Sequence, residues 1–158
     1  MYKNSIKSIT VVEATRKMEH YCAYQERCHK DIEHKLRTMT LIPEAKEKII
    51  LHLLEHNFLN EERFAKSFAR GKFNIKKWGK QRIIRELKFR EISAYNIKTA
   101  LKEISEIDYH NTFHELAEKK YNTIIALDKN KKRKKLADFL LYRGWETHLV
   151  YEKVNELI

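Results

Sequence analysis

Basic side chains are concentrated in the middle of the sequence and are its clearest indication of a chemical function. From Arg70 to Arg90, nine Lys or Arg residues stand against a single acid, Glu86. A cluster of one sign attracts a polyanion or an acidic protein surface, whereas a merely solvated helix face usually carries alternating signs. At helical spacing, basic residues of this region fall opposite the apolar ones and predict a binding surface over two adjacent helices. These residues are Arg63, Lys66, Arg70, Lys77, Arg82 and Arg85.

A second basic run, residues 129–135, lies where a later helix is expected to begin. Cations at a helix N-terminus oppose the helix dipole, so an acidic or phosphate-bearing partner would explain them. A frayed, solvated helix start explains them equally well, and both interpretations stay open. The secondary cluster consists of Lys131, Lys132, Arg133, Lys134 and Lys135.

Residues that could hold a metal or act as nucleophiles are present without the required pattern. His52 and His56 are four residues apart, as are His110 and His114, but neither pair belongs to a His-Glu-x-x-His motif. The cysteines lack the short spacing of a structural zinc site. Three isolated glycines exclude a phosphate-cradling loop. We therefore expect no metal, no cofactor and no enzyme, although a site assembled in space would escape this reasoning.

The composition indicates a helical chain. Its 158 residues include 35% charged side chains but only three glycines and one proline, too few for a strand-and-turn architecture. No apolar run approaches the roughly 18 to 20 residues that span a bilayer, and the first residues do not form a signal peptide. Two cysteines are too few for a disulfide framework. We expect a cytoplasmic protein with no membrane partner.

Apolar pairs recur along the chain at intervals of 51 and 53 residues. Ile32 and Leu36 return as Ile83 and Leu87, and then as a third pair, Leu136 and Leu140. This period predicts three degenerate repeats of three helices each: residues 1–57 (with 1–10 irregular), 58–107 and 108–158. Residues 58–107 carry a net charge of +7, against +2 in each of the flanking repeats. We predict an all-α fold in which the three tandem repeats form an elongated, possibly curved array.

Periodicity and capping residues locate the individual helices. Ile49, Ile50, Leu53 and Leu54 form a predicted inner stripe, and Phe64, Phe68 and Ile75 a second one. Trp145 occupies the slot of Leu41 and Ile92, which assigns it to the core. The expected helices are 11–27, 29–39, one with Pro43 in its first turn, one capped by Asn60, one after Gly79, one capped by Ser93, 108–127, 131–142 and 146–157.

Three motifs resemble those of the RecX family, the regulatory proteins of the bacterial RecA recombinase. Residues 60–65 (Asn-Glu-Glu-Arg-Phe-Ala), followed by 78–87 (Trp-Gly-Lys-Gln-Arg-Ile-Ile-Arg-Glu-Leu), resemble the second repeat of that family. Residues 27–36 resemble the entry to its first repeat, and 139–145 (Phe-Leu-Leu-Tyr-Arg-Gly-Trp) the end of its last. The resemblance covers residues 16–158, and its middle motif is the most specific.

The sequence departs from the family pattern at three points. The family commonly has glycine between the second and third helices of a repeat. Thr40 and Glu91 stand there in the first two repeats and only Gly144 agrees, which predicts a different geometry for those two turns. Cys28 replaces a serine that would cap a helix, so the start of that helix is also expected to differ.

The resemblance implies a non-enzymatic modulator of recombination and DNA repair. RecX-like proteins lodge in the groove of the recombinase–DNA filament and suppress ATP hydrolysis and strand exchange. By this likeness the partners are a RecA-type recombinase filament and, by weak direct contact, the single-stranded DNA within it; we expect a monomer. The residues assigned to electrostatic contact are Arg70, Lys72, Lys76, Lys77, Lys80, Arg82 and Arg85.

Two other function classes remain open. The chain could be a helical regulator whose three-helix units bind duplex or single-stranded DNA directly, without a recombinase. It could also be an unrecognised hydrolase, which would require a pocket that joins a nucleophile, a base and an oxyanion donor.

Overall fold

The chain folds into helices joined by short loops. The computed structural model describes residues 8–125 and 128–158, and within these ranges it contains nine helices and no strand, which confirms the all-α prediction. The helices are α1 (Val11–Tyr24), α2 (His29–Arg37), α3 (Pro43–Glu55), α4 (Glu61–Asn74), α5 (Lys80–Phe89), α6 (Ala94–Leu101), α7 (Glu106–Thr123), α8 (Lys129–Tyr142) and α9 (Thr147–Leu157).

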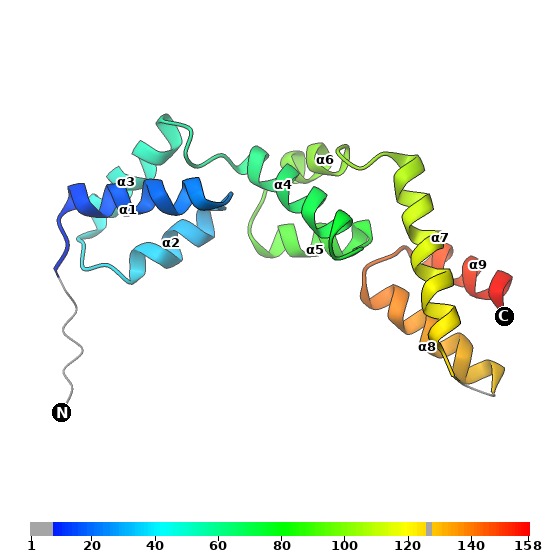
Figure 1. The fold of residues 1–158 in the computed structure, drawn as a ribbon. Coiled ribbons are helices and arrows are strands. Elements are labelled where there is room, and N and C mark those ends of the chain that lie inside the picture. Colours follow the sequence, from blue (N-terminus) through cyan, green and yellow to red (C-terminus); the bar gives the residue numbers. More distant parts are fainter. Residues whose placement is uncertain (1–7, 126–127) are drawn as a thin grey trace, which may run out of the picture.

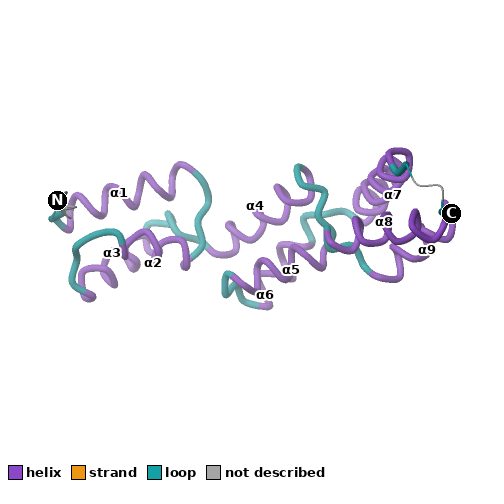
Figure 2. The backbone as a smooth tube through the Cα atoms, turned by 90° about the horizontal axis from the view of Figure 1, so that it is seen from below, coloured by secondary structure: helices purple, strands orange, loops and turns teal. Residues whose placement is uncertain are grey.

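The helices gather in consecutive groups of three along an elongated molecule. Repeat 1 (α1–α3), repeat 2 (α4–α6) and repeat 3 (α7–α9) follow one another from end to end in Figure 1, and the view from below in Figure 2 keeps the same order. The predicted elongated array of three-helix repeats is therefore confirmed. Because the groups follow one another along one axis, a surface that continues from one group to the next can contact a long partner.

Side-chain caps begin several helices where the sequence predicts them. The Asn60 side chain accepts a hydrogen bond from the Arg63 N–H at 2.9 Å, and Ser93 accepts one from the Asn96 N–H at 3.1 Å. At α2 the Cys28 N–H donates to the Asp31 carboxylate at 3.1 Å. The Asp31 carboxylate thus supplies part of the cap, and α2 begins directly after Cys28 although the expected serine is missing.

Some predicted helix ends and inner positions are wrong. The helix expected to start at Asp108 begins at Glu106, because Ser105 caps it, and it ends at Thr123, where the chain becomes extended. The last part of that prediction, residues 126 and 127, lies outside the described residues. Ile75 was expected on the inner face of α4 but is 77% exposed, since α4 ends one residue before it.

Three further expectations on the first and third repeats also differ from the structure. The first helix ends at Tyr24 instead of Arg27, because the chain is extended from Gln25 and the Arg27 side chain donates to the Tyr21 carbonyl. Leu54 is exposed, while Ile49 and Leu53 of the same stripe are buried. In repeat 3, α8 begins two residues earlier than predicted because Asp128 caps it.

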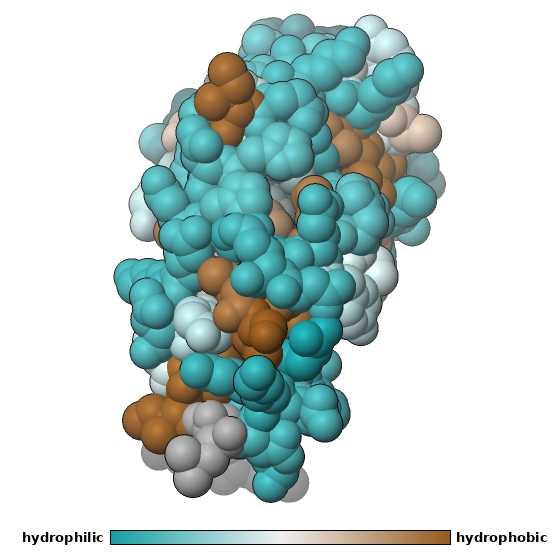
Figure 3. Space-filling view, turned by 90° about the vertical axis from the view of Figure 1, so that its right-hand side faces the viewer, coloured by the Kyte–Doolittle hydropathy of each residue, from teal (hydrophilic) through white to brown (hydrophobic). Residues whose placement is uncertain are grey.

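Apolar side chains form two separate cores. One belongs to repeat 1 and is built around Met18, Ile32 and Leu53. The other is continuous through repeats 2 and 3 and also takes in Cys28 from repeat 1. Repeats 2 and 3 are therefore joined through a shared interior, whereas repeat 1 has an interior of its own. On the face shown in Figure 3, exposed apolar residues form small patches separated by hydrophilic ones.

Trp145 is the centre of the shared core, as its position in the repeat predicts. It is 1% exposed, and its ring centroid lies 4.6 Å from that of Tyr109 and 5.2 Å from that of Phe113. Its indole N–H donates to the Lys77 carbonyl at 3.2 Å, which satisfies the one polar atom of the side chain. One residue of the loop before α9 thus contacts both α7 and the loop between α4 and α5.

The turn before α6 has the left-handed geometry that the sequence did not predict. Glu91 has φ 60° and Gly144, its counterpart in repeat 3, has φ 91°, whereas Thr40 in repeat 1 does not have a positive φ. Glycine adopts this conformation at little cost in free energy, whereas for other residues it costs about 1 to 2 kcal/mol. The expectation of a different geometry is therefore wrong at Glu91, where the strain of a side chain is tolerated.

Substituting the exposed Glu91 by glycine should stabilise the protein. We expect Glu91→Gly to raise the free energy of unfolding by about 0.5 to 1 kcal/mol, measured by urea denaturation, because the left-handed strain is relieved. Glu115→Gly, in the middle of α7, is the matched control and should lower it by about 1 kcal/mol. Equal destabilisation by both substitutions would contradict the role given to the Glu91 turn.

Candidate functional site

The seven residues expected to make electrostatic contacts lie on α4, α5 and the loop between them. Arg70 and Lys72 belong to the last turns of α4, and Lys76 and Lys77 to the loop, residues 75–79, which we call the basic loop. Lys77 was expected on the outer face of α4, but that helix ends at Asn74 and Lys77 has φ 57°. The seven differ in accessibility: Arg70, Lys76, Lys77 and Arg85 are exposed, and Lys72, Lys80 and Arg82 are half-buried.

Two of the seven are paired with carboxylates. Arg70 lies 3.4 Å from Glu103, and Lys80 lies 3.0 Å from Glu106. The hydrogen bond from Lys80 holds the pKa of Glu106 below its ordinary value. These partly exposed pairs are worth little for stability, but they reduce the positive charge that Arg70 and Lys80 offer to a partner.

The predicted basic stripe on α4 also meets acids, one from the loop after α1 and one from α4 itself. Arg63 donates to Glu26 at the junction with repeat 1, at 2.6 Å, and Lys66 pairs with Glu62 at 3.1 Å. Arg63 further donates to the carbonyls of Asn57 and Phe58. Arg63 therefore joins repeat 1 to repeat 2, while Lys76, Lys77 and Arg85 form no ion pair within the described residues.

Aromatic rings hold several of the cations in place. The Trp78 ring has the Lys72 ammonium 5.0 Å and the Arg82 guanidinium 4.1 Å from its centroid. Phe68 has Lys72 at 5.5 Å and Arg90 at 4.8 Å. Cation–π contacts contribute about 0.5 to 1 kcal/mol at exposed sites and fix the position of the charge. The cations here are thus ordered before any partner binds.

Arg82 has a structural role in addition to its charge. Its guanidinium lies 4.7 Å from the Tyr142 ring and donates to the Tyr142 carbonyl at 3.3 Å. It therefore bridges Trp78 of repeat 2 and α8 of repeat 3. Removing this side chain would disturb the junction as well as the surface charge.

Sequence reasoning missed cations of repeat 3 that lie beside the basic loop. Arg143 lies over Phe139 at 4.6 Å and donates to the Lys76 carbonyl at 2.8 Å, and Lys120 lies 4.8 Å from the same ring. A signal for them exists, because Phe68 and Lys72, Trp78 and Arg82, and Phe139 and Arg143 are each four residues apart. An aromatic residue followed by a cation at this spacing, within a helix or at one of its ends, places the charge over the ring. The three pairs are Phe68–Lys72, Trp78–Arg82 and Phe139–Arg143.

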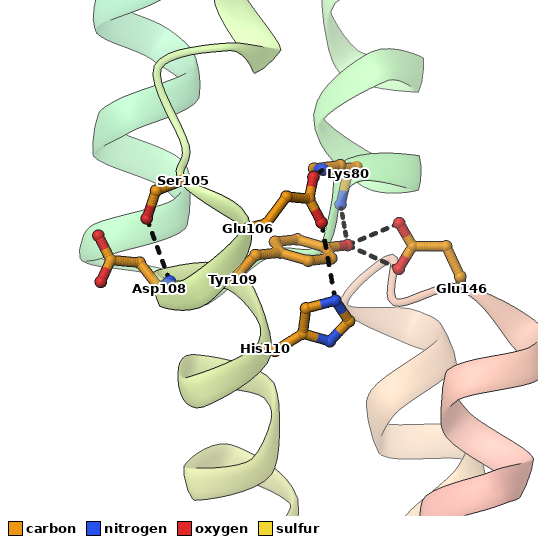
Figure 4. Close-up of polar contacts among 7 residues, drawn as sticks. All are labelled: Lys80, Ser105, Glu106, Asp108, Tyr109, His110 and Glu146. Atoms are coloured by element: carbon orange, nitrogen blue, oxygen red, sulfur yellow. Dashed lines mark hydrogen bonds and ion pairs between the residues drawn. The ribbon is translucent and has the colours of Figure 1, made fainter.

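Polar contacts around Tyr109 fix repeat 3 to the start of α5 (Figure 4). The Lys80 N–H donates to the Tyr109 hydroxyl at 2.9 Å, and that hydroxyl donates to the Glu146 carboxylate at 2.7 Å. Burial, followed by the hydrogen bond to Glu146, raises the pKa of Tyr109 above its ordinary value. The phenol thus stays protonated as a donor. His110, the next residue of α7, has its Nε2 3.6 Å from the Glu106 carboxylate.

Two glycines allow the backbones of repeats 2 and 3 to touch. The Gly79 N–H donates to the Arg143 carbonyl at 2.8 Å, and the Gln81 N–H donates to the Gly144 carbonyl at 3.0 Å. A Cβ on Gly79 would collide with the backbone of Gly144, and one on Gly144 would collide with Arg82. Only glycine permits this approach at either position.

The secondary cluster is spread around the first turns of α8. Lys132 lies 4.4 Å from the Tyr121 ring, Arg133 donates to Asn155, and Lys134 pairs with Asp138 at 2.8 Å. Lys131 and Lys135 are exposed. The five residues therefore do not form one face, and three of them are engaged within repeat 3.

The described part of the chain has no cluster of metal-ligand side chains, and its two cysteines are buried. In residues 8–125 and 128–158 no three His, Cys, Asp or Glu side chains come together as metal ligands. Burial raises the pKa of the Cys28 thiol to about 11 and also raises that of Cys22, so neither is a thiolate at neutral pH. Among those residues, no helix has both the length and the apolar character to cross a membrane.

Two family models match the chain. Residues 60–101 match the model described as RecX, second three-helix domain, and residues 107–154 match RecX, third three-helix domain. The matches coincide with α4–α6 and with most of α7–α9, which contain the basic loop and the Tyr109 contacts.

Curated relatives carry the same name. The regulatory protein RecX of Yersinia enterocolitica is 31% identical over 116 residues, which is 73% of this chain and 68% of that protein. The RecX of Clostridioides difficile is 27% identical over 113 residues, 71% of this chain and 53% of that protein. The RecX of Yersinia pseudotuberculosis is 33% identical over 103 residues, 65% of this chain. The matched segments span only 53% and 55% of the latter two relatives.

Solved structures share the fold. A crystal structure of regulatory protein RecX superimposes with a TM-score of 0.80 and 23% identity, covering 92% of this chain and 73% of that one. The crystal structure of RecX from Lactobacillus salivarius gives a TM-score of 0.74 and 23% identity, covering 93% and 96%. At this identity the likeness demonstrates the arrangement of the helices alone.

The glycine contact between repeats 2 and 3 can be tested by adding a single methyl group. We expect Gly144→Ala to lower the free energy of unfolding by at least about 2 kcal/mol, from left-handed strain and collision with Arg82. Gly71→Ala is the control: α4 has open space at that position, so it should raise stability by about 0.5 to 1 kcal/mol. Thermal or urea unfolding in which Gly144→Ala matches the wild type would refute the contact.

Proposed function

The chain belongs to the RecX family, and on this premise we propose that it is a non-enzymatic regulator that binds a RecA-type recombinase filament in the cytoplasm. It inhibits the ATPase and strand-exchange activities of the filament and thereby modulates recombination and DNA repair. The names of the relatives support a regulatory role. The resemblance of the sequence motifs to RecX supplies the recombinase as the partner.

One observation carries this proposal: accessible cations on a fixed loop lie in the middle of an elongated molecule. Lys76 and Lys77 are exposed in a loop whose carbonyls are tied to repeat 3 by Arg143 and Trp145. A filament is a long, repeating surface, so an elongated partner with a fixed central charge can contact adjacent subunits at once. Electrostatic complementarity of this kind increases the association rate and sets the orientation of binding.

Charge reversal at three exposed positions tests the proposal. We expect Lys76→Glu/Lys77→Glu/Arg85→Glu to keep wild-type helicity and to lose inhibition of recombinase ATPase by tenfold or more in the concentration required. Arg82 is left unchanged because it bridges repeats 2 and 3.

The control reverses three exposed lysines that lie outside the basic loop and α5. Lys48→Glu/Lys98→Glu/Lys102→Glu changes the net charge equally and should inhibit within about twofold of the wild type. Inhibition by the first variant equal to that of the wild type, at about 0.1 M salt, would contradict the assigned surface.

Direct binding to DNA is the second candidate, and the exposed Arg85 and Lys88 on α5 favour it. The middle helix of a three-helix unit can contact a duplex through such a face. Sequence-specific duplex affinity with a steep salt dependence, in the absence of recombinase, would favour this candidate over filament binding.

A further inference from the structure

The junction between repeats 1 and 2 is built differently from the junction between repeats 2 and 3. Repeats 2 and 3 share one core, and two backbone hydrogen bonds join the start of α5 to the loop before α9. Repeat 1 has a core of its own, and in the described ranges 8–125 and 128–158 no backbone hydrogen bond joins residues 8–59 to residues 61–158. A large apolar interface resists relative motion of two units, whereas a small polar one permits it.

One residue separates the two units at the junction of repeats 1 and 2. Leu59 is 2% exposed in the core of repeat 1, and its N–H donates to the Leu53 carbonyl of α3 at 3.0 Å. Because α4 begins at Glu61, Asn60 alone lies between that core and the first helix of repeat 2 (Figure 1). Its backbone is extended, with φ −146° and ψ 108°. Hinges are formed by such residues at the ends of elements, where a change of backbone angles disturbs neither interior.

The side-chain contacts across this junction are polar and partly exposed. The Arg63 guanidinium donates to the Glu26 carboxylate at 2.6 Å, and the Lys30 ammonium donates to the Phe89 carbonyl at 3.0 Å. We call these two the junction contacts. Contacts of this kind contribute little to stability. The second carboxylate oxygen of Glu26 is buried and accepts no hydrogen bond among the described residues, so water would satisfy it once the junction opened.

Apolar packing across the junction is confined to a small side chain. Among the described residues, Cys28 is the one member of repeat 1 that belongs to the core of repeats 2 and 3. A hollow of about 380 Å³ also lies between the repeats, with Glu26 and Asp31 on one side and Ser67 and Phe68 on the other. Little apolar surface therefore has to be exposed when repeat 1 turns away from repeat 2.

We propose that repeat 1 turns as a rigid unit about Asn60 while repeats 2 and 3 stay fixed to each other. In the closed arrangement, which the structure shows, the junction contacts are formed and Cys28 is buried. In the open arrangement the junction contacts are broken and Cys28 is exposed, while the core of repeat 1, which contains Cys22, stays intact. The hinge gives the array a variable curvature, with which repeat 1 adjusts to a long partner after repeats 2 and 3 have bound it.

The two cysteines report on this motion in the unmodified chain. Labelling by N-ethylmaleimide is followed at each cysteine by mass spectrometry, and each rate is divided by the rate in the fully unfolded chain. A chain that opens only by unfolding exposes both cysteines together, whereas the hinge exposes Cys28 alone. We expect Cys28 to be labelled about tenfold faster than Cys22 or more, although it is the more buried of the two. Low urea should hardly change the Cys28 rate, because opening exposes little surface.

Removing the junction contacts should favour the open arrangement. We expect Glu26→Ala/Lys30→Ala to raise the labelling rate of Cys28 by about three- to tenfold, because both contacts that hold repeat 1 against repeat 2 are lost. The rate at Cys22 should stay within about twofold of the wild type, since neither contact lies inside the core of repeat 1.

The control removes an acid and a lysine whose contacts lie inside repeat 1. Glu33 pairs with His29 at 3.2 Å, and the Lys35 ammonium lies 5.6 Å from the centroid of the Tyr21 ring. Glu33→Ala/Lys35→Ala therefore leaves the net charge as in the first variant and the junction contacts in place. Its Cys28 rate should stay within about twofold of the wild type. Circular dichroism verifies that both variants keep their helices.

The inference fails if the wild type is labelled equally fast at both cysteines. It also fails if Glu26→Ala/Lys30→Ala accelerates Cys22 as much as Cys28, because repeat 1 would then unfold instead of turning. A Cys28 rate in that variant equal to the control rate would overturn it as well. The measurement uses the free chain without recombinase, so its failure leaves the proposed function unchanged. Loss of the proposed function in an ATPase assay would likewise leave the hinge unchanged.

Discussion

The approach of two backbones at Gly79 and Gly144 is the constraint on which the rest of this structure depends. Because neither residue has a Cβ, the Gly79 and Gln81 N–H groups at the start of α5 donate directly to the carbonyls of Arg143 and Gly144 in the loop before α9. Trp145, the residue after Gly144, is buried and packs in the shared core. A side chain at either glycine would separate the loops and with them repeats 2 and 3.

This contact also determines where the positive charge lies. The carbonyls of Lys76 and Lys77 are bound by Arg143 and Trp145 of repeat 3, so the basic loop is held by the neighbouring repeat. A loop backbone fixed in this way loses little conformational entropy when a partner binds. Repeat 1 lacks such an anchor: it has a separate core and meets repeat 2 mainly through Arg63, Lys30 and Cys28.

The sequence identified the basic region, but only the structure divides it by role. Arg70 and Lys80 pair with acids, Arg82 bridges two repeats, and Lys76, Lys77 and Arg85 are exposed without an ion pair among the described residues. Helical spacing alone cannot make this distinction, because the acids that pair with Arg70 and Lys80 lie beyond the helices that carry these cations, Glu103 after α6 and Glu106 at the start of α7. Arg143 and Lys120 join the same surface from repeat 3, more than thirty residues away in the chain.

Local signals were enough to determine the fold class, the repeats and most helix starts. Periodic apolar pairs such as Ile32 and Leu36 are buried as predicted, and the Asn60 and Ser93 caps act within a single turn of chain. Helix ends and side-chain partners were decided by contacts between distant segments. Ile75 is exposed because α4 stops at Asn74, and Glu91 takes a left-handed turn despite its side chain. Local propensities are weak compared with the packing of repeats 2 and 3, so tertiary structure decides wherever the two compete.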